Sequence, residues 1–233
     1  MGWSHPQYTK GQVDAAGQKL AKWFSGVPEL SNWDYEEFDE MFAIVNNWRS
    51  AHNYPLIMMR KTLQNRAKSL DISAVVAQRI KRLSSIGSKL ERNAAMKLSQ
   101  MQDIGGCRAI MKNVKRVKRL VRLYKQRCEE KPDKGPEFVK AYDYIELPKS
   151  DGYRGVHLIH KYRSRSEKHK VFNGLRIEFQ LRSALQHAWA TAVETVGTFT
   201  QQALKSNQGD QDWLRFFALM GSAIAMREGT PIP

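Results

Sequence analysis

Cysteine is scarce and long apolar runs are missing from this 233-residue sequence. The two cysteines, Cys107 and Cys128, do not have metal-ligand spacing, and two are too few for a disulfide framework. No run is long and apolar enough to span a membrane. The first residues, 1–6, lack the charged-then-apolar pattern of a signal peptide. We therefore predict a cytoplasmic protein that does not use a membrane.

Acidic residues are too few to balance the basic ones. The chain has 38 Lys and Arg against 23 Asp and Glu, which gives a formal charge of +15 and a pI near 9.9. Such a balance favours polyanionic partners, namely nucleotides, nucleic acid or an anionic membrane. A solvated basic surface without a partner explains the same excess equally well, so charge alone does not decide.

Hydrophobic periodicity predicts alternating helices and strands. Helices are expected at residues 9–24, 34–49, 55–70, 113–130, 184–197 and 212–227, with a further helix from about residue 86, and strands at 74–82, 104–111, 139–147, 156–163 and 175–182. This order predicts an α/β (α+β) fold, with a mixed sheet of about five strands flanked by helices. We expect N-terminal helices over 1–70, a core over 71–200, a C-terminal helix within 201–228 and the start of a linker at 229–233.

Three local features complete the prediction of the fold. Ser84 and Ser85 suit the N-cap of the helix near residue 86, and Asp34 with Glu37 forms a capping-box pattern. The helix at 113–130 is rich in Lys and Arg, which indicates either a nucleic-acid or subunit contact face or, as we favour, a crossover helix with a solvated basic side. The polar residues 201–210 read as a linker or mobile loop.

The segment 79–108 carries groups that suit phosphates. A helix start flanked by hydroxyls and followed by Lys89 and Arg92 on one face is a site for anions. Asp103, beside two glycines, can approach a metal that bridges phosphates. The segment therefore reads as a polyphosphate and Mg²⁺ cradle made from Arg79, Lys81, Ser85, Lys89, Arg92, Asp103 and Arg108. On periodicity alone, a solvated basic helix beside an ordinary sheet remains an equal alternative.

Two later segments also bear on function. The loop 148–155 contains a proline and two glycines, and loops at strand ends often meet ligands. The strand at 175–182 alternates, so that Glu178, Gln180 and Arg182 share the face opposite its apolar residues. By default that polar face would be solvated.

Three separated motifs resemble the synthetase domain of the RelA/SpoT family. They are R-x-K-x-x-x-S-x-x-x-K-x-x-R with D-I-x-G-x-R within 79–108, D-Y-I-E-L-P-K-S-D-G-Y-R-G-V-H at 143–157, and I-E-F-Q-L-R-S-x-x-Q-H-A-W-A at 177–190. The resemblance covers about residues 70–200. It implies a nucleotidyltransferase-like core and an ATP-dependent pyrophosphotransferase that moves pyrophosphate from ATP to a ribose 3′-hydroxyl.

The resemblance also implies roles for single residues. Arg79 and Arg108 would sandwich the adenine of ATP, and Lys81, Ser85, Lys89 and Arg92 would hold its triphosphate. Asp103 would bind Mg²⁺, and Glu178 would share the metal or take the proton from the attacking hydroxyl. Tyr153 would stack on the acceptor base, while Lys149, His157 and Gln180 would hold its phosphates or sugar; His187 matches a small polar position of the acceptor site.

The resemblance implies two possible acceptors of the pyrophosphate group, and the sequence does not decide between them. The opening segment, the helix at 185–194 and the R-E-G-T-P end resemble the toxin domains of CapRel-like fused toxin–antitoxins, which modify the 3′-CCA end of tRNA and serve in anti-phage defence. Such a toxin would be neutralised by an antitoxin domain or protein that this chain does not contain. The alternative is a (p)ppGpp synthetase that uses GTP or GDP, and a second alternative is an inactive nucleotide- or RNA-binding module. No H-D hydrolase motif is present, so we expect synthesis without degradation.

Overall fold

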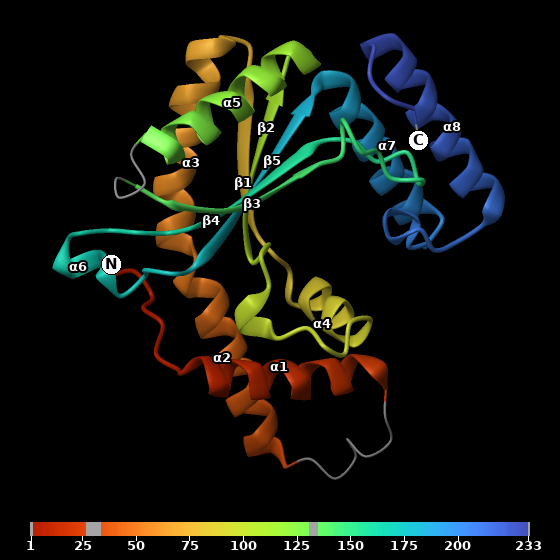
Figure 1. Cartoon of the computed structure of the whole chain (residues 1–233). Coiled ribbons are helices and arrows are strands. Elements are labelled where there is room, and N and C mark those ends of the chain that lie inside the picture. The colour runs from red at the N-terminus through yellow and green to blue at the C-terminus, as the bar shows by residue number, and fades with distance from the viewer. Residues whose placement is uncertain (1, 27–33, 131–134, 233) are drawn as a thin grey trace.

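A five-stranded mixed sheet forms the centre of the molecule (Figure 1). The computed structural model describes residues 2–26, 34–130 and 135–232. The strands are β1 (Val75–Ile80), β2 (Gly105–Met111), β3 (Glu137–Asp143), β4 (Val156–Lys161) and β5 (Arg176–Ser183), in the order β1-β2-β5-β4-β3. Only the β2–β5 pair is parallel among these strands. The predicted fold class, with about five strands flanked by helices, is confirmed.

The helices lie on both sides of the sheet and at its ends. They are α1 (Lys10–Ser25), α2 (Tyr35–Ala51), α3 (Asn53–Leu70), α4 (Leu83–Glu91), α5 (Val114–Glu130), α6 (Glu167–Lys170), α7 (Ala184–Phe199) and α8 (Gln211–Glu228), with short 3-10 turns η2 (Leu98–Gln100) and η3 (Leu204–Ser206). None of the helices within the described ranges is long and apolar enough to cross a bilayer. The predicted domain boundaries stay predictions.

One face of the sheet is buried under helices and holds the main core. Helix α3 packs on β1 and β2, and α5 packs on β5. The apolar side chains of β5, including Phe179, point into this layer together with Leu63 of α3 and Leu120 of α5, all at most 1% exposed. This burial of period-2 strand residues against helix stripes is the main source of stability for such a layer.

The opposite face of the sheet is polar. Strand register places Arg79 beside Gly106 and Glu178, and places Arg108 beside Gln180 and His157, and paired residues share a face. In Figure 1, α4 lies beyond one end of this face, and α7 with α8 lies at the other. The fold thus leaves a polar sheet surface between two helical walls.

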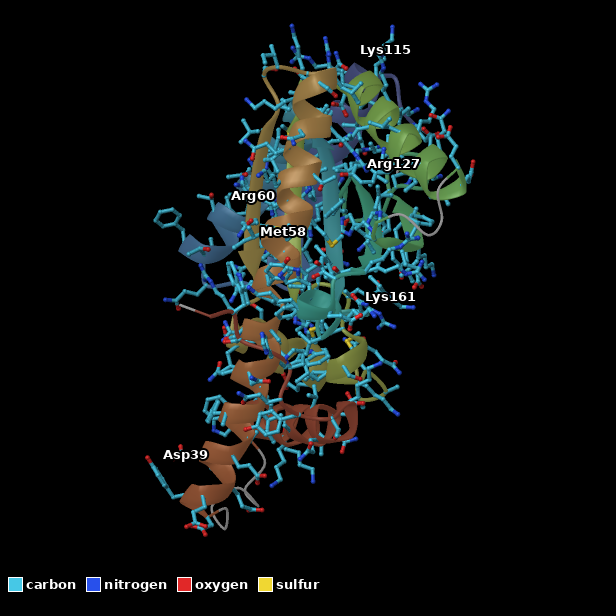
Figure 2. All side chains as sticks on the ribbon, turned by 90° about the vertical axis from the view of Figure 1, so that its left-hand side faces the viewer. Asp39, Met58, Arg60, Lys115, Arg127 and Lys161 are labelled. Atoms are coloured by element: carbon cyan, nitrogen blue, oxygen red, sulfur yellow. The ribbon has the colours of Figure 1, made fainter. Side chains whose placement is uncertain are left out.

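Helix α5 carries its basic side chains away from the core. Val117 and Tyr124 on its inner side are buried, and the ring of Tyr124 meets that of Phe179 edge-on at 5.4 Å. Lys115 and Arg127, near its two ends, extend outward (Figure 2). This agrees with a packed crossover helix that has a solvated basic side; a nucleic-acid or subunit contact there stays untested.

Three local predictions of the fold were wrong. Helix α4 begins at Leu83, so Ser84 and Ser85 lie in its first turn and the extended residue Arg82 is the N-cap. Asp34 is the N-cap of α2, but its side chain makes no capping hydrogen bond. Strand β3 ends at Asp143, because the Asp143 carboxylate accepts the backbone N–H of Ile145 at 3.0 Å and turns the chain.

The segment 201–210 is a fourth correction. Instead of a linker, it forms η3 and packs against α7 with Leu204 only 4% exposed. The Gln202 side-chain oxygen accepts the backbone N–H of Asp210, which closes the segment on itself. The sequence also predicts that residues 25–28 end the first helix and that 131–136 form a loop; residues 27–28 and 131–134 of these segments lie outside the described residues.

Candidate active site

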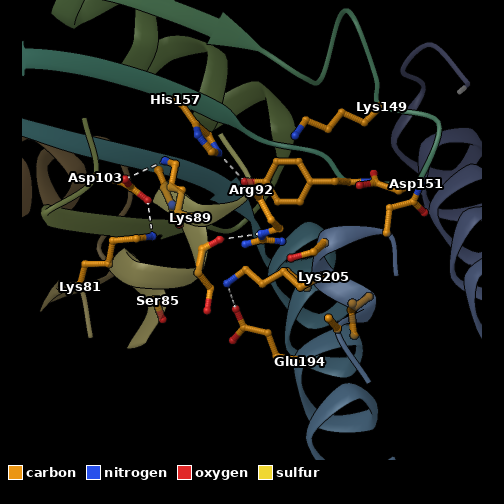
Figure 3. A pocket seen from close by; sticks show the side chains of 18 of the residues that line it. Lys81, Ser85, Lys89, Arg92, Asp103, Lys149, Asp151, His157, Glu194 and Lys205 are labelled. Atoms are coloured by element: carbon orange, nitrogen blue, oxygen red, sulfur yellow. Dashed lines mark hydrogen bonds and ion pairs between the residues drawn. The ribbon is translucent and has the colours of Figure 1, made fainter. Parts of the chain in front are cut away.

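A pocket of about 1270 Å³ lies on the polar face of the sheet, between α4 and the wall made by α7, η3 and α8 (Figure 3). Eleven of the residues predicted for the site line it: Arg79, Lys81, Ser85, Lys89, Arg92, Asp103, Lys149, Tyr153, His157, Glu178 and Gln180. The three sequence motifs, which are spread over residues 79–190, therefore meet at one place. Both Asp103 and Glu178 belong to this lining, as the hypothesis requires.

Asp103 sits between two lysines. Its Oδ2 accepts a hydrogen bond from Lys81 Nζ at 2.7 Å, and its Oδ1 accepts one from Lys89 Nζ at 2.9 Å. Burial alone would raise the pKa of Asp103, but the ammonium groups of Lys89 and Lys81 outweigh burial and lower it to about 2. Asp103 is therefore ionised at neutral pH and holds both lysines at the pocket.

Helix α4 supplies the wall next to Asp103. Its first turn brings Ser85 to the pocket, and its last residues bring Lys89 and then Arg92 to the same side. The unpaired backbone N–H groups of a helix start, together with hydroxyls and cations, suit the oxygens of a polyphosphate. Ser85, Lys89 and Arg92 therefore line one pocket, although the helix starts three residues earlier than expected, and their binding of phosphates stays a prediction.

Glu178 lies on the pocket floor and is held from two sides. His157 Nδ1 is 2.9 Å from Glu178 Oε1, and Gln180 Nε2 donates to Glu178 Oε2 at 2.8 Å. Burial would raise the pKa of Glu178, but the hydrogen bond from His157 and the other favourable contacts outweigh it, and the pKa is lowered. The negative charge of Asp103, which lines the same pocket, acts in the opposite direction and raises the pKa of Glu178. Glu178 is 8% exposed, so the expectation of a solvated face was wrong here.

Tyr153 joins the same hydrogen-bonded chain. Arg182 Nη2 donates to the Tyr153 hydroxyl at 2.9 Å, and that hydroxyl also contacts His157 Nε2. Lys149 Nζ and the Arg182 guanidinium lie 5.5 and 5.0 Å from the centre of the Tyr153 ring. Burial raises the pKa of Tyr153, so the phenol stays protonated at neutral pH. A continuous path thus runs from Arg182 through Tyr153 and His157 to Glu178.

Two predicted site residues, Arg108 and His187, are not among the residues that line the pocket. Arg108 pairs with Gln180 on the polar face of the sheet, and His187 belongs to α7. Burial and then the charges of Arg182 and other neighbours lower the pKa of Arg108, and burial followed by Arg108 and Arg182 lowers that of His187. The direct contact of these two residues with a nucleotide therefore stays a prediction.

The pocket also contains residues that sequence reasoning did not select. Tyr142 and Tyr144 lie at the acceptor end, with rings nearly parallel at 6° and centres 6.1 Å apart. Glu194 of α7 pairs with Lys205 of η3 on the opposite wall (Figure 3). The position of Tyr142 and Tyr144, close in sequence to the loop 148–155, could have indicated that they belong to the site. The polar composition of residues 201–210 gave no indication that this segment forms a wall of the pocket.

The pocket supplies some, but not all, of the oxygen ligands that Mg²⁺ needs. Mg²⁺ usually binds through one or two carboxylates together with substrate phosphates, and Asp103 and Glu178 are two such carboxylates in one pocket. The described residues contain no cluster of three or more His, Cys, Asp or Glu that could hold a metal without substrate. Mg²⁺ would therefore need oxygens from a bound nucleotide to complete its coordination.

A comparison with known families decides the assignment. Residues 78–202, more than half of the chain, match the family described as the region found in RelA / SpoT proteins. The chain belongs to the RelA/SpoT family. The predicted enzyme class, an ATP-dependent pyrophosphotransferase of the RelA/SpoT type, is thereby confirmed, and so is the family resemblance. No curated protein matches this RelA/SpoT chain significantly.

Solved structures share the fold of this RelA/SpoT protein. Small alarmone synthetase 1 from Bacillus subtilis superposes with a TM-score of 0.61 at 20% identity, covering 76% of this chain and 87% of that chain. Small alarmone synthetase 2 from the same organism gives 0.62 at 18% identity, covering 79% and 94%. A GTP pyrophosphokinase family protein from Streptococcus pneumoniae gives 0.58 at 22% identity, covering 82% and 88%.

Proposed function

We propose that this pocket transfers the β,γ-pyrophosphate of ATP to the 3′-hydroxyl of a ribose. The observation that carries the proposal is the convergence of Asp103, with its two lysines, and Glu178, with its His157 and Gln180 contacts, in one cavity. Its volume of about 1270 Å³ exceeds the roughly 300–1,000 Å³ typical of a site for one small ligand. A donor and an acceptor can therefore lie side by side.

The donor half is the side formed by β1 and α4. Arg79 and Arg108 would stack on adenine, because guanidinium planes pack well on a base. Lys81, Ser85, Lys89 and Arg92 would bind the triphosphate. Asp103 would hold Mg²⁺, which when bound neutralises charge on the transferred phosphates, and Glu178 would either share this ion or act as the general base.

The acceptor half is the side formed by β3, β4 and the loop between them. Tyr153 would stack on the acceptor base, with Lys149, His157, Gln180 and His187 around its sugar or phosphates. Glu178 is ionised and oriented by two hydrogen bonds, so it can take the proton from the 3′-hydroxyl as that oxygen attacks the β-phosphorus of ATP and AMP leaves. Alignment and the cationic pocket supply the remaining acceleration.

For the acceptor, we propose the 3′-CCA end of tRNA. Three tyrosines, Tyr142, Tyr144 and Tyr153, line the acceptor half, and single-stranded ends bind by stacking successive bases on aromatic rings beside cations. Lys140 and Lys149 lie 4.7 and 4.8 Å from the ring centres of Tyr142 and Tyr144. The net charge of +15 also suits a large polyanion. Such an enzyme would act as a translation-blocking toxin, as in the CapRel-like proteins that the sequence resembles, and would require an antitoxin.

GDP or GTP is the second candidate acceptor. Its specific support is that small alarmone synthetase 1 from Bacillus subtilis, with which this chain shares a fold at a TM-score of 0.62 and 19% identity, was solved bound to its product pppGpp. In that case a single base on Tyr153 would suffice and the other two tyrosines would play no part in binding.

An acceptor competition tests the proposal. The purified protein is incubated with γ-labelled ATP, Mg²⁺, deacylated tRNA and GDP together. Label in tRNA supports the tRNA proposal, label in a guanosine tetraphosphate supports the alarmone candidate, and label in neither contradicts pyrophosphate transfer to both. A salt titration adds a second criterion, because tRNA modification should fall more steeply with salt than GDP modification if many phosphates are contacted.

A further inference from the structure

We propose that the C-terminal turn, defined as residues 228–231, fixes the position of Tyr153 through Arg154, and thereby controls acceptor binding. This inference rests on the proposed function, in which Tyr153 meets the acceptor. It assigns Arg154, Glu228 and Thr230 as positioning residues, none of which lines the pocket.

Arg154 is the central residue of this arrangement. It follows Tyr153 directly in the chain, yet it points away from the pocket and is 2% exposed. Its Nη1 donates to Thr230 Oγ1 at 3.2 Å, and its Nη2 donates to the backbone carbonyl of Pro231. The Ile145 carbonyl, 3.5 Å from Nη1, is a third and longer contact. A buried guanidinium is costly unless oxygens satisfy it, so the two shorter contacts with the C-terminal turn help to fix where Arg154 lies.

Glu228 ties the same turn to the other wall of the pocket. Its carboxylate accepts a hydrogen bond from the Ser183 hydroxyl and another, at 2.8 Å, from Gln186 Nε2. Ser183 and Gln186 form the capping box of α7, the helix that carries Trp189 and Glu194 into the pocket. Burial lowers the pKa of Arg154, and the negative charge of Glu228 acts in the opposite direction and raises it.

The rest of α8 reaches the acceptor loop directly. Gly221 lies so close to the loop that a Cβ there would sit 2.6 Å from Gly152 Cα. Gly152 itself has φ +89°, a conformation that favours glycine. Because Gly152 and Arg154 flank Tyr153, both neighbours of that tyrosine contact α8 or the turn that follows it.

Thr230→Val tests the proposal in the full chain, because valine keeps the shape of threonine but cannot accept the hydrogen bond from Arg154. Thr230→Ser is the matched control, since it keeps the hydroxyl. We expect T230V to raise the KM for the acceptor, measured with deacylated tRNA and with GDP, by about tenfold. The KM for ATP should change less than about twofold, and T230S should behave as the wild type.

Hydrogen exchange provides a readout that does not depend on activity. In T230V, peptides from residues 148–155 should exchange faster, while peptides from residues 79–92 should not. Glu228→Gln provides a second variant, with the same expected pattern. If the wild type modifies neither acceptor, the proposed function fails, while the exchange result still reports on the turn. Unchanged exchange of 148–155 in both variants, or an equal loss of ATP and acceptor binding, would overturn the inference.

Discussion

Nδ1 of His157 lies 2.9 Å from Oε1 of Glu178, while Nε2 of the same ring contacts the hydroxyl of Tyr153. One imidazole therefore joins the proposed base to the proposed acceptor platform. Both ring nitrogens are engaged within the protein, so a phosphate that bound His157 would have to replace one of these contacts. Because His157 contacts Glu178 and Tyr153 through different nitrogens, either residue can be substituted while the contact of His157 with the other is kept.

Glu178→Gln should lower kcat by at least about a thousandfold, because glutamine keeps the shape but cannot take the proton. Binding of a non-hydrolysable ATP analogue, measured by calorimetry, should stay within about twofold. Glu194→Gln is the matched control, since Glu194 lines the same pocket but pairs with Lys205, and it should retain most activity. Transfer by E178Q at the wild-type rate would remove Glu178 from the mechanism.

Tyr153→Ala should raise the acceptor KM by about ten- to a hundredfold, because stacking on one aromatic ring contributes roughly 1–3 kcal/mol. Tyr153→Phe keeps the ring and loses only the contacts of the hydroxyl with Arg182 and His157. Its acceptor KM should therefore rise much less. Steady-state kinetics at saturating ATP measure both values. Equal defects in the two variants would indicate that the hydroxyl, and not the ring, matters.

Tyr142→Ala separates the two candidate acceptors. If a single-stranded RNA end lies along the three tyrosines, tRNA modification should fall about tenfold, whereas a single nucleotide on Tyr153 would not be affected. Rates with deacylated tRNA and with GDP are compared in the same preparation. An unchanged tRNA rate would show that no base stacks on Tyr142.

His160→Phe should reduce the acid sensitivity of the fold. His160 is 2% exposed among the rings of Tyr124, Phe138 and Phe179, and burial followed by the charge of Arg66 lowers its pKa to about 4. Because the unfolded chain binds this proton near pH 6.5, stability is lost as pH falls from 6.5 to 4, by up to about 3 kcal/mol.

Thermal unfolding at pH 7.5, 6, 5 and 4.5 measures this effect. H160F should lose less stability than the wild type across this range. Part of the loss should remain, because buried His52, whose pKa burial also lowers to about 4, titrates in the same window. Identical pH profiles for H160F and wild type would contradict a neutral, buried His160.

The sequence predicted those features that depend on short-range patterns. The alternation of β5 correctly placed Phe179 in the core and Glu178 on the other face. Asp103, Tyr153 and Glu178, which the three motifs predicted to meet, all line one pocket. Burial of Glu178 was missed, because only the walls of α4, α7 and η3 turn that polar face into a pocket floor.

Features that depend on long-range contacts escaped prediction. Residues 201–210 look like a linker in composition, yet Leu204 is buried and Lys205 reaches Glu194 across the pocket wall. Thr230 falls in a segment of linker composition, yet its hydroxyl accepts a hydrogen bond from a residue 76 positions earlier. No local pattern encodes such a partner.

The two lysine contacts of Asp103 have a consequence for the order in which ligands arrive. An incoming triphosphate competes with this carboxylate for the ammonium groups of Lys81 and Lys89, since phosphate oxygens and carboxylate oxygens attract the same donors. In the proposed function, lysines that bound the nucleotide would free the oxygens of Asp103 for a cation. A divalent ion and its nucleotide should accordingly enter as a couple, each strengthening the affinity for the other.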